Sequence, residues 1–472
     1  MRLEHDLLGE REVPDDVYWG IHTLRAKENF CVSSYRIHPE LIRALASVKK
    51  ACAKTNVDMG FLSEKIGSAI VTACNEIIEG RLHDQFVVDV FQGGAGTSSN
   101  MNANEVIANR AIELLGGKRG DYHLIHPNNH VNLHQSTNDA FPTAIRIAMI
   151  GLHCQLADTL IELQQALRRK AEEFSTVLKM GRTQHQDATP ITLGQEFTAY
   201  ARVVGRDRYR IVESQAILLR ANLGGTVIGT GIAAPRGFGL RAIDKLNEDL
   251  GLNLFQAKDL VDATQNLDGF AAVSSALKMH AANISKITSD LMLLASGPRA
   301  GWSEIILPEM QAGSSLMPGK INPVIGEMVE QVAMQVISND YVVCEVIRRG
   351  RLELNAFLPL LAHCLFESIS LLNKAERIFM EKYVEGIKAN VEACRAHLER
   401  AWNTWGLPAL VPYIGYEKAT EIARKASAQH KTAREVIISE GLFAEAELDR
   451  ILREGIGAFD PDDMRIRVRD KP

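Results

Sequence analysis

Five long segments in which proline and glycine are rare constrain the fold of this chain more than any other feature. They cover approximately residues 143–174, 190–221, 266–296, 324–349 and 354–396. Each is typical of a long α-helix. A helix of roughly thirty residues is about 45 Å long, which is more than one small domain can cover. We therefore expect an all-α protein with a long central helical bundle, and burial of the helices against other subunits of an oligomer.

The third of these segments indicates how the helices pack. Its apolar residues recur at steps of three and four, which is the spacing of a helix packed nearly parallel to its neighbours. The residues at this spacing are Val273, Leu277, His280, Ile284, Ile287, Leu291 and Leu294. The sequence predicts that His280 is a hydrogen-bonded core or interface residue rather than a ligand.

Composition excludes several classes of protein. The chain has 472 residues, of which 46% are hydrophobic, so it is long enough for two or three domains and a large core. Its 53 basic and 58 acidic residues give a net charge of −5, spread along the sequence, which argues against a nucleic-acid-binding surface. The seven cysteines are scattered without a CxxC pair, so they indicate neither a disulfide framework nor a thiolate metal site.

The N-terminal sequence MRLEHDLLGEREVPDD is charged and lacks the apolar stretch of a signal peptide. The sequence also lacks a run of about eighteen apolar residues, which a transmembrane helix would need. We therefore expect a cytoplasmic protein without a membrane span. Changes in composition predict three domains: an N-terminal domain (1–138), a central long-helix bundle that forms the oligomer core (139–392) and a small C-terminal helical domain (393–472).

The segment QAGSSLMPGKINP, residues 311–323, is a candidate anion-binding loop. Its two glycines and two prolines exclude a long helix or a central strand. Backbone N–H groups around Gly313, the ammonium of Lys320 and the amide of Asn322 could together hold a carboxylate or an enolate. The same residue types also build ordinary surface turns, and the composition of the segment leaves both interpretations open.

Other polar segments lie between the predicted helices. In GGAGTSSNMNANEV (93–106), a glycine turn leads into a helix N-terminus, which suits an anion but also an ordinary capped turn. MGRTQHQDATPITLGQEF (180–197) is predicted to be a loop, in which His185 could be a general base or a solvated residue. NLGGTVIGTG (222–231) is predicted to be a loop with close backbone packing, where contact with an anion is a secondary interpretation.

A further polar segment, HPNNHVNLHQSTND (126–139), is rich in histidine and asparagine. His126, His130 and His134 are four residues apart, so a helix would place their imidazoles on one face, as in some zinc sites. Pro127 weakens such a helix, and an acidic partner at a suitable offset is missing from the sequence. A metal site is therefore the minor interpretation of this segment.

Taken together, these segments resemble the aspartase/fumarase superfamily. GSSLMPGKINP is similar to its signature loop, and GTSSNMNANEV, HPNNHVNLHQSTND, GRTQHQDATPITLGQEF and NLGGTVIGTG are similar to its other blocks. VPDDVYWGIHTLRAKENF, DQFVVDVFQGGAGTS and PYIGYEKATEIA resemble the aspartase branch more than class II fumarases. The resemblance, which runs from about residue 5 to 455, implies an all-α homotetramer whose active sites combine segments of three subunits.

The resemblance also implies an anti elimination that converts L-aspartate to fumarate and ammonia through an enediolate intermediate. Ser314 would be the base that removes the proton. Position by position, Thr97, Ser136, Thr137 and Ser315 would bind the carboxylate that becomes the enediolate, and Thr183, Lys320 and Asn322 would bind the α-carboxylate. Asn138, with Thr97, would face the amino group. The resemblance implies no organic cofactor and no resident metal, and leaves activation by Mg²⁺ open.

Gln184 bears on which elimination is expected. Fumarases usually have a histidine here, paired with a glutamate that aligns with Glu327, a supporting residue. Expulsion of hydroxide needs a proton donor, whereas ammonium leaves as ammonia without one. Because glutamine cannot supply that proton, Gln184 favours an ammonia-lyase. The alternatives are a class II fumarase, an ammonia-lyase for an N-substituted aspartate, and a non-catalytic structural relative.

Overall fold

The computed structural model describes residues 1–456 of the chain. These residues form two compact units, each built from three stretches of sequence. Unit 1 consists of Met1–Ile161, Val204–Ser285 and Met328–Arg377, and unit 2 consists of Glu162–Val203, Lys286–Glu327 and the part of the chain that begins at Ile378. The division into three domains along the sequence stays a prediction, and residues 457–472 of the predicted C-terminal domain lie outside the described residues.

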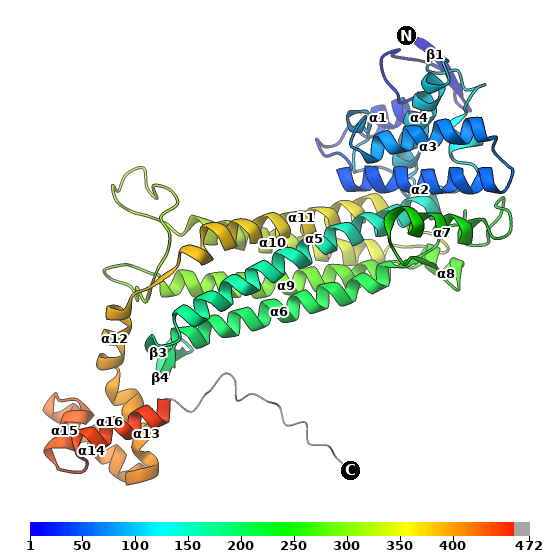
Figure 1. Ribbon diagram of the computed structural model, residues 1–472. Coiled ribbons are helices and arrows are strands. Elements are labelled where there is room, and N and C mark those ends of the chain that lie inside the picture. Colours follow the sequence, from blue (N-terminus) through cyan, green and yellow to red (C-terminus); the bar gives the residue numbers. More distant parts are fainter. Residues whose placement is uncertain (457–472) are drawn as a thin grey trace, which may run out of the picture. The chain divides into compact units, whose positions relative to one another are not determined.

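Unit 1 begins with a β-hairpin that the sequence analysis did not predict. Strands β1 (Arg2–Asp6) and β2 (Gly9–Val13) pair antiparallel, and Gly9 has a φ of 111° at the tight turn between them. A short helix, α1 (Ile21–Asn29), follows. Helices α2 (Pro39–Asp58), α3 (Glu64–Ile78) and α4 (Thr97–Leu114) then lie side by side (Figure 1).

Five long helices confirm the main expectation from the sequence. They are α5 (Thr137–Glu173), α6 (Leu193–Leu218), α9 (Asp268–Leu294), α10 (Val324–Ile347) and α11 (Leu358–Lys382). The larger part of each of α5, α6, α9, α10 and α11 belongs to unit 1, where these parts run side by side (Figure 1). The strands of the described residues form only two-stranded sheets, so the fold is all-α with small β additions.

The fifth predicted helix was too long, because α11 ends at Lys382 rather than near residue 396. The chain there turns through a 3₁₀ segment, Val384–Gly386, and the ring of Pro308 lies so close to Gly386 that a Cβ atom would be 2.3 Å from it. A short strand, β8 (Lys388–Ala389), then pairs with β7 (Ile305–Ile306). A distant segment of the chain therefore packs just beyond the end of the helix, which local sequence does not indicate.

The remaining elements of unit 1 are small: β5 (Arg220–Ala221), β6 (Phe255–Gln256), α7 (Phe238–Leu250) and α8 (Leu260–Gln265). Unit 2 contains strands β3 (Leu178–Thr183) and β4 (Gln186–Thr192) and the helices α12 (Val391–Arg400), α13 (Trp402–Ile414), α14 (Tyr416–Gln429), α15 (Ala433–Ser439) and α16 (Glu445–Ile456). Trp402, Trp405 and Leu410 of α13 share a buried cluster with Met180 of β3.

Helix α5 is long and apolar enough, by length and composition alone, to meet a criterion for a membrane span among the described residues. However, 67% of the qualifying stretch is buried inside the protein, as in the core helix of a bundle. The seven cysteines are free thiols, and Cys52, Cys74, Cys364 and Cys394 are buried.

The seam predicted for α9 is confirmed, since all seven of its residues are buried. His280 is a hydrogen-bonded core residue, as expected. Its Nδ1 lies 3.2 Å from Asp207 Oδ2, and its Nε2 lies 3.0 Å from Glu376 Oε1. Both carboxylates are also buried, so the imidazole bridges two acidic residues of different helices within unit 1.

This bridge makes the free energy of unfolding depend on pH. Burial alone would lower the pKa of His280, but its hydrogen bonds with Asp207 and Glu376 raise that pKa to about 9, above the ordinary value of 6.5. Folding therefore favours the protonated imidazole. The stabilisation is fully present below about pH 6.5 and is lost as the pH rises through about 9.

We expect the free energy of unfolding to fall by up to roughly 3 kcal/mol between pH 6.5 and 9, and His280→Gln to reduce this dependence strongly. Thermal or urea denaturation followed by circular dichroism at several pH values measures the effect. His5→Gln, at an exposed histidine, is the matched control and should follow the wild type. Equal pH dependence in the wild type and in His280→Gln would contradict this account.

Candidate active site

Thr97 is the first residue of α4, directly after the glycine turn predicted from the sequence. The preceding Gly96 has a φ of 99°, and a Cβ atom there would lie 2.6 Å from the ring of Phe141. Only glycine fits this position without displacement of the ring. The Thr97 hydroxyl donates a 2.7 Å hydrogen bond to Gly94 O. The N–H groups of Thr97 and Ser99 in the same turn donate to Gly94 O and Gln92 Oε1, so an anion bound here would compete with these internal acceptors.

Ser136, Thr137 and Asn138 form the entry to α5. Asn138 N donates to Ser136 Oγ at 3.2 Å, and Asn138 Nδ2 donates to Val227 O at 2.7 Å. The carbonyl of Asn138 accepts a 2.9 Å hydrogen bond from Asn222 Nδ2. The three predicted substrate donors are therefore held against the segment 222–231.

Asp139 connects this entry to the same segment. Its buried carboxylate accepts hydrogen bonds of 3.0 Å from the N–H groups of Ser136, Gly224 and Thr226. Burial raises the pKa of Asp139, and these backbone donors act in the opposite direction. The close backbone packing predicted for 222–231 is confirmed, since a Cβ atom on Gly224 would lie 2.7 Å from Gly239 Cα.

The three histidines of 126–134 do not stack on one helical face. His126 precedes a short π-helical turn, Pro127–Val131, which contains His130, and His134 has a φ of 62°. His126 Nδ1 accepts from Asn128 N, and His130 Nδ1 accepts from His126 N. In their neutral forms both rings therefore carry the proton on Nε2, which leaves no free lone pair for a metal.

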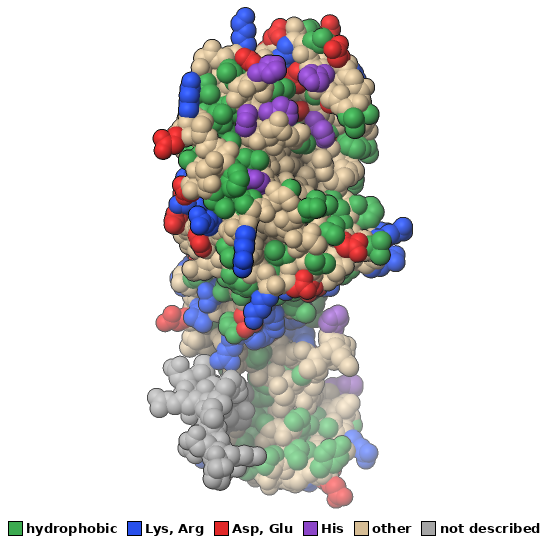
Figure 2. Space-filling view, turned by 90° about the vertical axis from the view of Figure 1, so that its right-hand side faces the viewer, with side chains coloured by type: hydrophobic (Ala, Val, Ile, Leu, Met, Phe, Trp, Pro, Cys, Tyr) green, Lys and Arg blue, Asp and Glu red, His purple; other side chains and the backbone are tan. Residues whose placement is uncertain are grey.

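Histidine side chains gather near the top of the view in Figure 2. Among residues 1–456 no group of three or more His, Cys, Asp or Glu side chains is arranged to hold a metal ion. Burial lowers the pKa of His126, His130 and His134.

Residues 180–192 form most of a β-hairpin rather than the predicted loop. Strands β3 and β4 pair from Leu178↔Thr192 to Thr183↔Gln186, and Gln184 and His185 make the two-residue turn. Both turn residues have positive φ, 53° and 62°, and both are exposed. Such turns usually contain Asn or Gly, so the dipeptide Gln-His did not predict a hairpin here. The structure brings Thr183 and Gln184 together at its tip.

A buried ionic cluster holds the base of this hairpin, and the sequence analysis missed it. Glu304 accepts two hydrogen bonds from Arg182, of 3.0 and 2.9 Å, and lies 3.1 Å from Lys179 Nζ and 2.8 Å from His397 Nδ1. Burial alone would raise the pKa of Glu304, but Arg182 and Lys179 hold it below its usual range. Arg182 also lies over the ring of Trp302, at 4.0 Å.

Arg182 directly precedes Thr183, and this proximity was the only sequence signal for the cluster. Glu304 is 122 residues further along the chain. A cavity of about 330 Å³ adjoins the cluster and is lined in part by Gln184 and His185.

The loop 311–323 contains no helix or strand, as predicted, and closes on itself. Gly313 N donates to Lys320 O at 2.8 Å, and Asn322 Nδ2 donates to Gly313 O at 2.7 Å. The hydroxyl oxygen of Ser314 accepts from Leu316 N at 3.2 Å and from Met317 N at 2.9 Å.

Two backbone donors at one hydroxyl are a feature that would stabilise an alkoxide. Ser315 and Lys320 are exposed on the same loop, and Glu327 lies in the first turn of α10.

The predicted site residues thus fall into two groups. Thr97, Ser136, Thr137 and Asn138 belong to unit 1, and Thr183, Gln184, Ser314, Ser315, Lys320, Asn322 and Glu327 belong to unit 2. Ser136, Thr137 and Asn138 share the entry to α5, and Ser314, Ser315, Lys320 and Asn322 share one loop. Their roles in catalysis stay predictions.

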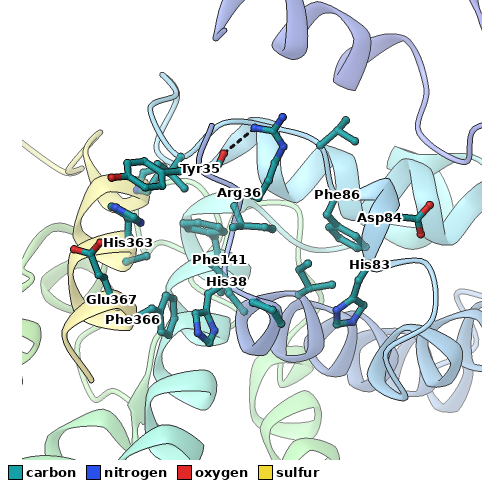
Figure 3. Close-up of a pocket in the computed structure, with 18 residues that line it drawn as sticks. Tyr35, Arg36, His38, His83, Asp84, Phe86, Phe141, His363, Phe366 and Glu367 are labelled. Atoms are coloured by element: carbon teal, nitrogen blue, oxygen red, sulfur yellow. Dashed lines mark hydrogen bonds between the residues drawn. The ribbon is translucent and has the colours of Figure 1, made fainter. Parts of the chain in front are cut away.

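A cavity of about 500 Å³ in unit 1 was not foreseen and contains none of these residues (Figure 3). Its lining includes two pairs of aromatic rings: the Tyr35 and His363 rings are 4.7 Å apart, and His38 stacks on Phe366 at 5.3 Å. Burial lowers the pKa of His38 to about 4, so this imidazole is uncharged at neutral pH. Phe141 lines the cavity and also packs against Gly96.

Comparison with known proteins places the chain in a family. Residues 9–338 match the family model described as Lyase, and residues 408–454 match the model described as the fumarase C C-terminus. The chain is 49% identical over 452 residues to an aspartate ammonia-lyase of Bacillus sp, covering 96% of each chain. It is 46% identical over 455 residues to an aspartate ammonia-lyase of Escherichia coli strain K12, covering 96% of this chain and 95% of the other.

Solved structures of related proteins give the same family assignment. A fumarate lyase:delta crystallin from Brucella melitensis bound to cobalt is 50% identical, with a TM-score of 0.94 over 97% of this chain and 100% of the other. A class II fumarase from Schistosoma mansoni is 32% identical, with a TM-score of 0.92 over 97% and 99%. These matches confirm the predicted all-α fold, and they imply a small dicarboxylate substrate and an oligomeric arrangement. The chain therefore belongs to the Lyase family, as a member of the aspartase/fumarase superfamily.

Proposed function

We propose that this chain is a carbon–nitrogen lyase that reversibly eliminates ammonia from L-aspartate to give fumarate. The observation that carries the proposal is the similarity, along nearly the whole chain, to aspartate ammonia-lyases. The reactive groups that the reaction needs are also present. Ser314, Lys320 and Asn322 remain on the signature loop, which disfavours a non-catalytic structural relative.

In the proposed mechanism Ser314 removes the proton from the carbon beside one carboxylate. The pKa of a serine hydroxyl is ordinarily far too high for the group to be ionised, yet only the alkoxide is a strong enough base. The site must therefore stabilise the alkoxide. The N–H groups of Leu316 and Met317 already point at Ser314 Oγ. The ammonium of Lys320, on the same loop, would add positive charge. The resulting enediolate then expels the amino group from the neighbouring carbon as ammonia.

The remaining donors divide between the two carboxylates of aspartate. Thr183, Lys320 and Asn322 would bind the α-carboxylate. The carboxylate that becomes the enediolate would be bound by hydroxyl donors, namely Thr97, Ser136, Thr137 and Ser315. Their hydrogen bonds strengthen as negative charge develops, so they stabilise the transition state more than the substrate. Asn138 would face the amino group.

Gln184 favours aspartate over malate as substrate. The glutamine amide at the hairpin tip cannot donate a proton to a leaving hydroxide, whereas ammonia needs no such donor. A class II fumarase or an ammonia-lyase for an N-substituted aspartate is the competing proposal. We further propose that the enzyme is cytoplasmic and works without an organic cofactor or a resident metal, with Mg²⁺ as an activator to be tested.

A homotetramer with active sites shared between subunits completes the proposal. Helix α10 carries exposed apolar side chains at helical spacing: Met334 is 65% exposed, Ile337 41% and Tyr341 68%. Helix α6 likewise exposes Tyr209 and Val212. Apolar faces of this kind on bundle helices support burial against other copies of the chain.

The proposed substrate is tested by the rate of fumarate formation, followed by ultraviolet absorbance, with L-aspartate and L-malate side by side. We expect turnover of aspartate and little or none of malate. N-methyl-L-aspartate, as a third substrate, separates an ammonia-lyase for free aspartate from one for N-substituted aspartate. Malate turnover without aspartate turnover would overturn the proposal in favour of a fumarase.

Ser314→Ala should lower kcat for aspartate by about 10² to 10⁴-fold or more, because the base is lost. Binding of a dicarboxylate inhibitor such as succinate, measured by calorimetry, should be nearly unchanged, and light scattering should still give four chains. Ser33→Ala, which removes an N-terminal serine hydroxyl bonded to Asp89, is a control that should retain activity. Turnover by Ser314→Ala near the wild-type rate would identify another residue as the base.

Lys320→Met should raise KM and lower kcat together, because the ammonium contacts the carboxylate in both the ground state and the transition state. Loss of one such charge-assisted hydrogen bond corresponds to about ten- to a hundredfold in kcat/KM. Steady-state kinetics with aspartate measures both constants. Lys431→Met, at another exposed loop lysine, should leave them unchanged. An unaltered KM in Lys320→Met would remove Lys320 from the substrate site.

A further inference from the structure

Lys49 is a buried cation in the interior of unit 1. It lies on α2 and has an exposed fraction of 0%. Its Nζ donates hydrogen bonds to Asn132 Oδ1 at 2.8 Å and to Gln135 Oε1 at 2.9 Å. Both acceptors are neutral amides, so these hydrogen bonds do not neutralise the ammonium. A buried ammonium whose two hydrogen-bond acceptors are both amides is an unusual feature in a protein interior.

Asn132 is the centre of a network that joins three elements. Its Oδ1 also accepts hydrogen bonds of 3.1 Å from Asn100 Nδ2 and from Asn104 Nδ2, both on α4. Its Nδ2 donates to Gln135 O at 3.1 Å. The network therefore links α2, α4 and the turn 131–135.

The two ends of this network lead directly to predicted substrate donors. Asn100 lies three residues beyond Thr97, the first residue of α4. Gln135 immediately precedes Ser136, and its Nε2 donates to Val131 O at 3.0 Å and to Leu133 O at 3.3 Å, which fixes the turn. Lys49 thus donates to the two residues through which α4 and the segment 136–138 are connected.

Stability alone does not account for this arrangement. Removing an ammonium from water is costly, and an apolar side chain of similar length would fill the same space without that cost. The Oδ1 atoms of Asn100 and Asn104 are buried without a hydrogen-bond partner, which adds to the unfavourable terms. Arrangements that sacrifice stability locally are typical of functional sites.

We propose that Lys49 is a positioning residue, which fixes Thr97 and Ser136–Asn138 for substrate through its hydrogen bonds to Asn132 and Gln135. The proposal rests on the proposed function of these four residues as donors to aspartate. Lys49 is too deeply buried to touch the substrate itself, so it acts through the network.

Lys49→Met in the full-length chain separates positioning from structural support. It removes both hydrogen bonds and the buried charge but keeps an unbranched side chain of similar size. We expect kcat/KM for aspartate to fall about 10- to 100-fold, mainly through a higher KM, because small displacements of binding groups have effects of this size. The thermal midpoint should stay equal or rise. Lys50→Met is the matched control, because Lys50 lies next in sequence but pairs with Asp249, and it should keep the wild-type KM.

The pH profile gives a second readout. Burial lowers the pKa of Lys49 to about 8, and the charged or titratable groups that oppose this shift are Cys52 on α2, Asp139 on α5 and Cys74 on α3. A positioning ammonium is present below about pH 8 and is lost as the pH rises through that value. The wild type should therefore show a rise in KM through about pH 8, and Lys49→Met should lack this rise.

Amide hydrogen exchange of residues 131–138, measured by mass spectrometry, reports on the network without any substrate. Faster exchange in Lys49→Met than in Lys50→Met is expected.

If the wild type turns over no aspartate, the proposed function fails, whereas the exchange result still supports or overturns the role of Lys49. Wild-type exchange and wild-type KM in Lys49→Met would overturn the inference, as would a loss of thermal stability that matches the loss of activity. If Lys49→Met is insoluble, Gln135→Leu, which removes one acceptor, should give the same rise in KM, and an unchanged KM overturns the inference.

Discussion

The buried carboxylate of Asp139 is the interaction on which the substrate donors of unit 1 depend. Three backbone N–H groups, from Ser136, Gly224 and Thr226, converge on its two oxygens. A buried carboxylate that lost these donors would be strongly destabilising, so the entry to α5 and the segment 222–231 move together or not at all. The glycines of that segment are needed because Gly224 approaches the backbone of Gly239 within the reach of a Cβ atom. The small residues of this loop therefore allow its backbone N–H groups to reach the carboxylate of Asp139.

Buried charges in this protein are compensated in different ways. The way in which each is compensated distinguishes groups that stabilise the fold from a group proposed to serve the active site. His280 lies between two carboxylates, and Glu304 receives Arg182 and Lys179, so each charge meets an opposite one. These clusters lock helices or a hairpin into one arrangement. Lys49 donates its hydrogen bonds to two amides, and burial lowers its pKa to about 8. Of these three buried groups, Lys49 is the one whose surroundings are least well explained by a contribution to stability.

The sequence could predict those features that depend on local pattern. The scarcity of proline and glycine located the five long helices, and helical periodicity predicted the buried position of His280. Glycine and proline located the open loop around Ser314. Features set by distant partners were not predictable. The ring of Pro308 packs against Gly386 just beyond the end of α11, and Glu304 contacts the hairpin from a position far along the chain. The candidate site shows the same limit: motif resemblance supplied its residues, but the support by Lys49 and Glu304 needed three-dimensional contacts.

The loop around Ser314 provides part, but not all, of what a serine base requires. Two N–H groups at Oγ favour an alkoxide, and they come from the loop itself, so this part of the site is formed within one chain. However, Lys320 is exposed and Leu316 is 86% exposed in the described chain. In water a single ammonium stabilises an alkoxide weakly, because the high dielectric constant screens the charge. The loop must therefore be covered during the reaction, and the proposed sharing of active sites between subunits would supply that cover. Exclusion of water would strengthen each interaction with the developing negative charge and make Ser314 competent as a base.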